Sequence, residues 1–481
     1  MYFYNSLTKK KEEFKPLTPG HINLYTCGVT VYDDCHIGHA RSLYIFDCLK
    51  RYLEYRGFRV KFVRNITDVD DKIIDRARKE NEGEPLIDTV KMVTQRYIER
   101  YYEDMEALGI ERADIEPKAT DNISGMIAHI EGLLAKGFAY VTESGVYFSV
   151  RKFSDYGRLS GQGIAQMQSG TRIEPDEAKQ DPLDFALWKK SKPNEPSWPS
   201  PWGEGRPGWH IECSVMSAKY LGVETLDIHA GGRDLIFPHH ENEIAQSEAL
   251  TGKPFARYWL HHGLLAVEGR KMAKSLGNFV TVRDFSKRQY PIDALKLFFL
   301  QAHYSQTLDF SWERIDEKRS ALETIMTFLS RVRQKQEDEE FFTKPCKDTK
   351  CSPEWLCAEV QKAKNDFLAA LDDDFNTPQA QAALFEIINA CNKALYDIGY
   401  TREYLPALLY AQGIVLELGG ILGLSLSGGH AAIPEPQIKM SIEMRDKLKK
   451  QKQYEEADKI RRELEIKGII LEDTKDGTKW R

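Results

Sequence analysis

The sequence predicts an α/β protein: a Rossmann-like, doubly wound parallel sheet with a small insertion, followed by an α-helical domain and a small C-terminal domain. Three observations carry this prediction. The chain up to residue 66 runs through strand, helix and strand patterns, as in the βαβ unit of a parallel sheet. Strand-like runs return between residues 226 and 265. Beyond about Phe310, apolar residues recur at helical spacing with few strand patterns.

The βαβ unit near the N-terminus is the basis for the parallel sheet. An apolar run at 22–27 leads into a glycine-containing turn, and a helical pattern then continues to Gly57. A second apolar run follows at 58–66. Because parallel strands need a crossover connection, a doubly wound sheet follows, and we expect the runs at 226–229 and 259–265 to extend it.

An insertion separates the two halves of the predicted sheet. Helical spacing at 124–136 and two apolar runs around a turn, at 139–141 and 146–150, predict a helix plus a hairpin. A proline- and tryptophan-rich stretch at 188–209 predicts an extended loop that returns to the sheet. The expected segments are 1–118 and 201–265 for the two halves of the sheet domain, 119–200 for the insertion, 266–319 for a loop region, 320–424 for a helical bundle, 425–436 for a linker and 437–481 for a small terminal domain.

Composition indicates an ordinary soluble protein of several domains. The chain has 481 residues, which is too long for one compact module, and it is 42% hydrophobic and 29% charged, which excludes a disordered or collagen-like chain. A net charge of -6 argues against a generally cationic coat for nucleic acid. The eight cysteines are too sparse for a disulfide framework. No export signal is visible and the apolar window at 408–426 contains charge and glycines, so we expect a cytoplasmic protein with no membrane segment.

The first motif with chemical potential lies between the first strand and its helix. It runs from Cys27 to His39 and ends in His36-Ile37-Gly38-His39. The free N–H groups and the dipole at a helix N-terminus favour a phosphate, and both imidazoles can face it. Taken alone, two histidines at a helix start are more often a cap or a packed pair.

The second motif is Lys271-Met272-Ala273-Lys274-Ser275, which follows the run at 259–265. Two lysines on a loop close to a glycine can hold a pyrophosphate as charge develops in a transition state. In isolation, a short basic loop is usually a solvated surface.

The third constellation suits a metal ion. His239 and Glu243 are four residues apart, which places both side chains on one face of a helix, and Cys213 lies in a separate motif at 208–213. With Cys27 at the end of the first strand, a zinc set can assemble at the carboxyl ends of the strands. A structural zinc site or buried thiols without metal are the alternatives, and Cys35 is a competitor for Cys27.

A further group of cysteines, Cys346, Cys351 and Cys357, is a weak signal for a second metal site. The group has no obvious fourth ligand. We expect ordinary reduced thiols there.

The pairing of His-Ile-Gly-His with a distant Lys-Met-Ala-Lys-Ser resembles the class I aminoacyl-tRNA synthetases. The third position of the second motif, Ala273, is usually serine in that family, so one hydroxyl contact is expected to be lost. The chain is most similar to the cysteine-specific enzymes of this class from end to end, through the stretches 27–41, 64–72, 153–160, 208–213, 229–243, 373–378 and 457–481.

The resemblance implies an ATP-dependent ligase that forms cysteinyl adenylate and transfers cysteine to the terminal ribose of tRNA. It implies one zinc ion per subunit, bound by Cys27, Cys213, His239 and Glu243 and joined by the substrate thiolate, and ATP with Mg²⁺. Serine and cysteine are near-isosteres, so the shape of a cavity discriminates weakly between them, whereas a zinc–thiolate bond strongly favours cysteine. It further implies catalytic roles for His36, His39, Lys271 and Lys274, an ATP site that adds Gly38 and Ser275, and an amino-acid pocket with Thr67, Trp209, His229 and Asp234. A buried tryptophan or a core histidine is the plain alternative within that pocket.

The tail is expected to recognise tRNA. Five basic residues stand against one acid between 445 and 452, and Tyr454 and Asp458 follow on a helical pattern. Basic residues suit phosphates, an aromatic ring can stack on an unpaired base, and a carboxylate can accept from a base amino group. The resemblance implies an anticodon-binding domain here and a stem-contact region at 266–319. An amphipathic surface helix is the alternative.

Three rival functions remain open at this stage. A related ligase that transfers cysteine to an amino sugar shares both nucleotide motifs and the zinc set, but it lacks a tRNA-binding tail. A zinc hydrolase would need a His-Glu-x-x-His helix, and the order here is His-His-Glu-Asn-Glu. A catalytically silent RNA-binding protein would have no need of both histidines and both lysines. We expect a monomeric cysteine-specific tRNA ligase.

Overall fold

The computed structural model describes the chain in two compact units, Met1–Gly423 and Leu424–Arg481. Each unit is described by itself. The residues described are 1–81, 83–163, 179–272, 277–337, 352–396, 402–426, 435–450, 453, 457, 460–461, 471–474 and 477–480.

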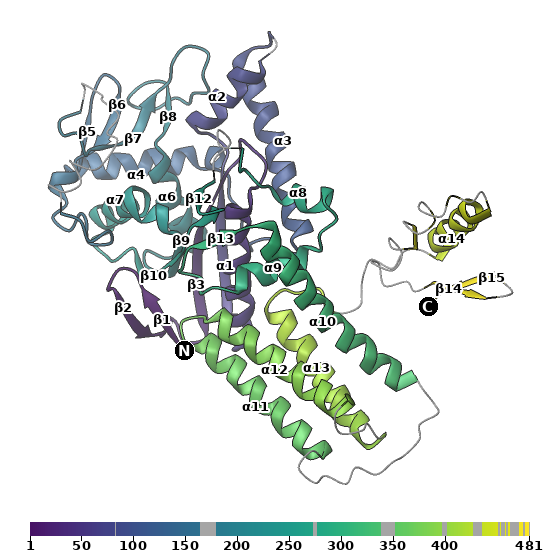
Figure 1. The fold of residues 1–481 in the computed structure, drawn as a ribbon. Coiled ribbons are helices and arrows are strands. Elements are labelled where there is room, and N and C mark those ends of the chain that lie inside the picture. The colour runs from purple at the N-terminus through teal and green to yellow at the C-terminus, as the bar shows by residue number, and fades with distance from the viewer. Residues whose placement is uncertain are drawn as a thin grey trace. The chain divides into compact units, whose positions relative to one another are not determined.

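The first unit is organised around a four-stranded parallel sheet, as the sequence predicts. Its strands are β3 (His21–Thr30), β4 (Arg59–Thr67), β9 (Leu226–Gly232) and β10 (Ala256–His262). Their spatial order is β10-β9-β3-β4, and every neighbouring pair is parallel (Figure 1). From β3 the chain crosses to β4 on one side of it, and it later returns to β9 on the other side. β3 and β9 therefore flank a topological switch point. Doubly wound folds bind ligands at such a point, outside the carboxyl ends of the strands.

Helices connect these strands on the pattern that the sequence indicates. The crossover from β3 to β4 is α1 (Ile37–Tyr55), which ends before Gly57 takes a positive φ of 88°. Further helices are α2 (Asp71–Glu80), α3 (Leu86–Ala107), α6 (Trp209–Leu221) and α7 (Glu241–Thr251). Both α1 and α6 contact β4, and α6 and α7 contact each other.

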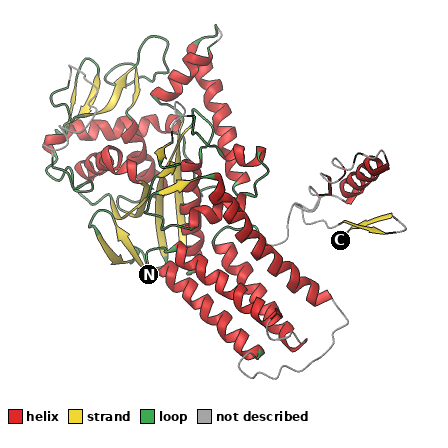
Figure 2. Ribbon diagram, viewed as in Figure 1, coloured by secondary structure: helices red, strands yellow, loops and turns green. Residues whose placement is uncertain are grey.

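The insertion contains more sheet than the sequence predicts. Helix α4 (Ile123–Ala135) packs beside an antiparallel sheet in the order β5-β6-β7-β8 (Figure 2), formed by Ala139–Val141, Gly145–Phe148, Phe185–Lys190 and Gly205–Pro207. The stretch predicted as an extended loop therefore holds the end of β7 and all of β8. The prolines of this stretch argue against strands, so the sequence does not indicate the strand pairing. Trp188, which is 1% exposed, and the buried Leu187 pack β7 into the core of the insertion.

The predicted strand at 259–265 is divided in two. β10 ends at His262, and β11 (Leu265–Val267) begins a separate sheet with β12 (Arg270–Lys271) and β13 (Leu308–Phe310). Gly263 explains the break, because a Cβ at this position would lie 2.2 Å from the backbone of Gln306. The remaining short elements of this region are η1 (Ala119–Asn122), η2 (Val150–Lys152), η3 (Arg233–Leu235), η4 (Ile236–His240), α8 (Val282–Lys287), α9 (Ile292–Leu300) and the hairpin β1–β2 (Tyr2–Asn5 and Lys10–Glu13).

A group of long helices follows, as predicted. It consists of α10 (Trp312–Glu337), α11 (Pro353–Asp372), α12 (Thr377–Tyr396) and α13 (Leu405–Ile421), with the short turn η7 (Arg402–Tyr404) before α13. The segment 402–421 is apolar and long enough to cross a membrane by length and composition, and half of its apolar window is buried. Because α13 contacts α10, α11 and α12, this burial is that of a core helix. Cys357, from the group predicted as a weak metal signal, is a free thiol, as is Cys391 on α12. The other two members of that group, Cys346 and Cys351, lie outside the described residues.

The second unit contains α14 (Glu435–Lys450) and a hairpin of β14 (Leu471–Thr474) and β15 (Gly477–Trp480). The hairpin has no counterpart in the sequence prediction. Tyr454 and Asp458, the predicted tRNA-binding residues, lie outside the described residues.

Candidate active site

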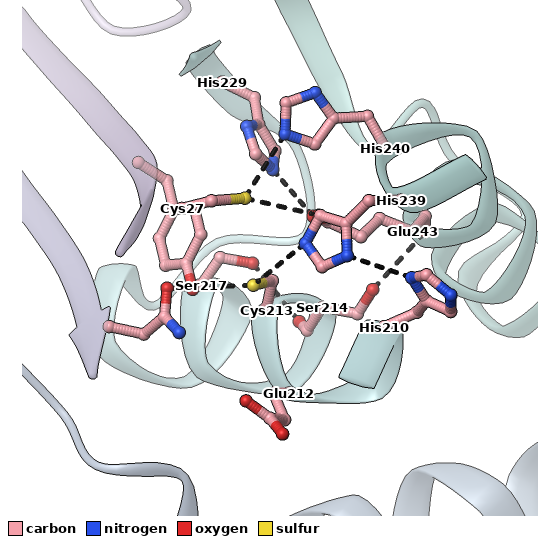
Figure 3. Close-up of polar contacts among 12 residues, drawn as sticks. Cys27, His210, Glu212, Cys213, Ser214, Ser217, His229, His239, His240 and Glu243 are labelled. Atoms are coloured by element: carbon pink, nitrogen blue, oxygen red, sulfur yellow. Dashed lines mark hydrogen bonds and ion pairs between the residues drawn. The ribbon is translucent and has the colours of Figure 1, made fainter. Parts of the chain in front are cut away.

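Four metal-ligand side chains meet at the switch point of the sheet. Cys27 comes from β3, Cys213 from the second turn of α6, His239 from η4 and Glu243 from α7 (Figure 3). One ligand atom of each lies within 4.8 Å of every other, and Cys213, His239 and Glu243 are buried. The His239 Nε2 atom is 2.8 Å from Glu243 Oε1 across the four-residue spacing that the sequence shows. The structure thus brings together all four residues of the predicted set.

Each cysteine has a close contact with another member of this set. Cys27 Sγ lies 3.5 Å from Glu243 Oε1, and Cys213 Sγ lies 3.6 Å from His239 Nε2. β3 carries a register shift between Thr26 and Val29, next to Cys27. Gly28 makes this possible, because a Cβ there would lie 1.5 Å from the backbone oxygen of Asn65.

The electrostatics of the cluster favour a cation. Burial and the neighbouring Cys213 thiol raise the pKa of Cys27 well above its ordinary value, while the hydrogen bond from Cys27 lowers the pKa of Cys213 to about 6. Burial alone would lower the pKa of His239, but Glu243 and Cys213 raise it to about 10. A divalent metal ion at this position would favour the thiolate forms of both cysteines and would supply a positive charge to Glu243, away from water.

A second set of ligands shares part of this cluster. Cys27 and Glu243 also lie within 4.8 Å of His229 and His240, with one ligand atom from each. His240 Nε2 is 3.2 Å from Cys27 Sγ, and His229 Nε2 is 2.7 Å from Glu243 Oε2. The first set contains two thiols and the second only one, so the first is the better match for zinc.

Further polar residues orient these ligands, and sequence reasoning assigned them no role. His210 Nδ1 lies 2.9 Å from His239 Nδ1, and His240 Nδ1 lies 2.8 Å from His261 Nε2. Asn65 Oδ1 accepts a hydrogen bond from the Gly28 N–H at 2.8 Å, which holds the strand beside Cys27. Ligand histidines commonly bind such second partners through the other ring nitrogen. The only sequence signal was that His210, His240 and Asn65 stand inside the quoted motifs.

The four predicted amino-acid-binding residues differ in their relation to the cluster. The buried Thr67 donates to Glu212 at 2.8 Å, an interaction that sequence reasoning missed. The Trp209 ring is 37% exposed and lies 4.0 Å from the His239 ring, so it provides an accessible aromatic face beside the candidate ligands. His229 is fully buried and contacts Glu243, whereas Asp234 is exposed in η3, after β9.

The two predicted phosphate-binding histidines meet at the N-terminus of α1. His36 is the N-cap residue, and its Nδ1 accepts hydrogen bonds from the N–H groups of Gly38 at 3.1 Å and His39 at 3.2 Å. The rings of His36 and His39 stack with centroids 3.8 Å apart. Burial and the neighbouring His36 lower the pKa of His39 to about 3, so this imidazole is neutral at physiological pH. The cap and the stacked pair, which are the plain alternatives at this motif, are both present.

A cavity opens beside this histidine turn. It is lined by Val29 to His36, and by His39, Tyr97, Tyr101 and Phe279. The lysine motif, residues 271–275, is described only at its start. Lys271 lies in β12 without a described side chain, and Lys274 and Ser275 lie outside the described residues.

Comparison with known families gives two matches along the chain. A model described as "tRNA synthetases class I (C) catalytic domain" matches residues 13–320. A model described as "DALR domain" matches residues 366–427. Together they cover the sheet, the insertion and the end of the helical region.

Relatives match over the whole length. The "Cysteine--tRNA ligase" of Persephonella marina is 47% identical over 496 aligned residues, which cover 99% of this chain and 99% of that protein. The protein of the same name from Caldicellulosiruptor saccharolyticus is 48% identical over 481 residues, covering 100% and 99% of the two chains. Among solved structures, methionyl-tRNA synthetase of Mycobacterium tuberculosis in complex with methionyl-adenylate aligns with a TM-score of 0.64 at 16% identity, covering 88% of this chain and 93% of that one. At that identity the structural likeness shows the fold alone.

Proposed function

The chain belongs to the class I aminoacyl-tRNA synthetases and, within them, to the cysteine–tRNA ligase family, and we propose how its residues carry out that reaction. Its activity is the ATP-dependent attachment of cysteine to tRNA. The observation that carries the residue assignments is the cluster of two thiols, an imidazole and a carboxylate at the switch point of the sheet.

Cys27, Cys213, His239 and Glu243 are the proposed zinc ligands. The support is the chemistry of the donor set, since thiolate, imidazole and carboxylate groups are the ligands that zinc takes in proteins. When bound, zinc supplies a Lewis-acidic centre that accepts a thiolate far better than a hydroxyl, which separates cysteine from serine. Trp209, Thr67, His229 and Asp234 are proposed to complete the amino-acid pocket, supported by the exposed Trp209 face beside His239.

Activation of cysteine is proposed at the histidine turn. The substrate carboxylate oxygen attacks the α-phosphorus of ATP, the bond to the bridging oxygen breaks, and pyrophosphate leaves with that oxygen. His36 and His39 stabilise the α-phosphate, and Gly38 lets the chain approach it. Lys271, Lys274 and Ser275 bind the departing pyrophosphate, with Mg²⁺ on the phosphates. The cavity lined by His36 and His39 supports this proposal, and the dipole of α1 favours an anion there, although the first N–H groups of the helix donate to partners within the chain.

Transfer to tRNA(Cys) is proposed to use the C-terminal segment for anticodon recognition, through Tyr454 and Asp458. Asp458→Ala should leave adenylate formation unchanged and weaken tRNA charging by about tenfold, because a lost base contact costs ~1–3 kcal/mol. Pyrophosphate exchange and tRNA charging on the same preparation measure the two steps, and an equal loss in both would contradict a recognition role. We further propose that the protein is a monomer. We also propose a location in the cytoplasm, where the six described cysteines, which are all free, would stay reduced.

The test of the proposed function is amino-acid-dependent exchange of pyrophosphate into ATP on protein of measured zinc content. Strong exchange with cysteine and very weak exchange with serine is the expected result. Exchange with both amino acids would contradict the zinc selection. No exchange from folded, zinc-replete protein would contradict the roles given to the histidines and lysines.

A further inference from the structure

A buried carboxylate joins three segments beside the histidine turn. Asp104 lies near the end of α3 and is 3% exposed. Its Oδ2 accepts a hydrogen bond from the Cys35 N–H at 3.3 Å, and its Oδ1 lies 3.2 Å from Nε of Arg283 on α8. We name these contacts the Asp104–Arg283 junction. It fastens the residue before His36 to a helix that follows the lysine motif in sequence.

Backbone pairing connects the same two segments. The Ile37 N–H donates to the Val280 carbonyl at 3.0 Å, and the Val282 N–H donates to the Cys35 carbonyl at 3.0 Å. Phe279 contributes an edge-on contact to the His36 ring, with centroids 5.4 Å apart. The start of α1 therefore rests on the stretch 279–282, and the junction lies at one end of this pairing.

The Arg283 guanidinium is the cation that faces the buried carboxylate. It also lies 2.5 Å from Glu103 Oε2 and 3.8 Å from Asp34 Oδ1. The side chain of Glu103 is 64% exposed and that of Asp104 is 4% exposed, so the Asp104 pair is the one that water screens least. Burial raises the pKa of Asp104 to about 6, and Arg283 opposes this rise. Loss of Arg283 removes this opposition and favours the neutral form of Asp104, so the ionic contact that fastens α8 to the Cys35 segment should be lost.

We propose that Arg283 is a positioning residue for the ATP step: through Asp104 and the 280–282 pairing, it sets where the turn carrying His36 and His39 lies relative to the segment that follows the lysine motif. This inference rests on the proposed function of that turn. The described ion pairs of Arg283 are with the carboxylates of Asp104, Glu103 and Asp34. Small misplacements of a group that stabilises a transition state reduce rates strongly, so the effect should appear in ATP kinetics.

The test compares Arg283→Ala, Arg283→Lys and Asp104→Asn with the matched control Arg319→Ala. Arg319 is also an arginine ion-paired with an aspartate, at 3.3 Å from Asp316, but it lies on α10 away from the junction. In tRNA-free pyrophosphate exchange, Arg283→Ala should reduce kcat/KM for ATP by about tenfold or more, while KM for cysteine and zinc content stay within about twofold. Arg283→Lys should recover part of the loss, and Arg319→Ala should match the wild-type protein.

A double-mutant cycle tests whether the two partners act together. The loss in Arg283→Ala plus Asp104→Asn should be smaller than the product of the single losses, because both remove one interaction. Wild-type ATP kinetics in Arg283→Ala, or a loss that falls equally on ATP and cysteine and follows the melting temperature, would overturn the proposal.

Deuterium uptake by the peptides covering 33–39 and 278–284 provides a readout that does not depend on activity. Uptake should rise in both peptides in Arg283→Ala and stay at the wild-type level in Arg319→Ala. Unchanged uptake would overturn the junction. Absence of pyrophosphate exchange in the wild-type protein would instead contradict the proposed function. The comparison of deuterium uptake would still decide whether Arg283 positions the turn.

Discussion

The candidate metal cluster and the histidine turn both lie where β3 ends, yet they are built in opposite ways. The cluster draws its ligands from positions 27, 213, 239 and 243, which lie on four separate elements. The turn is local, since the His36 ring accepts from two N–H groups within the next three residues. The difference teaches that the proposed metal site depends on the assembled sheet, whereas the proposed phosphate site depends mainly on the first turn of α1 and its supports.

The largest expected effect comes from removing one thiol of the cluster. Cys213→Ser should lose zinc and reduce cysteine-dependent exchange by about 1,000-fold, because a hydroxyl is a poor zinc ligand and the remaining buried groups lose their cation. Zinc stoichiometry and pyrophosphate exchange measure both effects. Cys35→Ser is the matched control, since Cys35 is a buried thiol next to His36 that does not belong to the cluster. Full zinc content in Cys213→Ser would exclude the ligand set.

The histidine turn allows its two roles to be separated. His36→Asn should preserve the helix cap, because asparagine is a strong N-cap residue, and should still reduce exchange by about 100-fold through loss of the imidazole. His36→Ala should show the same kinetic loss and additionally destabilise the protein by about 1 kcal/mol. Urea unfolding and exchange kinetics distinguish the two. Normal exchange in His36→Asn would mean that His36 serves only as a cap.

The overlap of the two ligand sets gives a smaller effect. If the ligands are Cys27, Cys213, His239 and Glu243, then His240 is a partner of Cys27 and not a ligand. His240→Gln should in that case keep zinc stoichiometry and weaken zinc affinity by about tenfold. Competition with a chelator measures this affinity. Complete loss of zinc in His240→Gln, with zinc retained in Cys213→Ser, would favour the set of Cys27, His229, His240 and Glu243.

The last expected effect concerns the stability of the fold and appears only in acid: it is an acid dependence of unfolding that arises in the turn. The pKa of His39 falls from 6.5 to about 3 on folding, so the unfolded state binds more protons between these values. This contribution to stability is complete above pH 6.5 and is lost as the pH falls towards 3, by about 2 kcal/mol at pH 5. His39→Gln should flatten the decline in unfolding free energy measured from pH 7 to 5.

His129→Gln is the matched control for that prediction. The pKa of His129, in the insertion, is lowered to about 4, mainly by burial. The His129→Gln variant should flatten the decline in unfolding free energy similarly. It should leave pyrophosphate exchange unchanged, since His129 lies outside both the metal cluster and the histidine turn. A wild-type slope in His39→Gln would show that this histidine titrates normally.

The sequence by itself determined the fold class and the chemical types of the site residues. A strand–helix–strand pattern follows from local periodicity, and the His239–Glu243 spacing implies one helical face, so both can be inferred without knowing the neighbours. The structure bears out the parallel sheet and brings the four candidate ligands together. The family resemblance is confirmed by relatives that match over the whole chain.

Only the tertiary structure decided what surrounds those residues. The contacts of His210 with His239 and of His240 with His261 join positions far apart in the sequence, and no spacing rule reports them. Strand β8 and the break after His262 also depend on partners that close the insertion sheet or crowd Gly263. The physical reason is common to all of these: periodicity reports which face of an element is buried, whereas packing between distant segments decides what each buried group contacts.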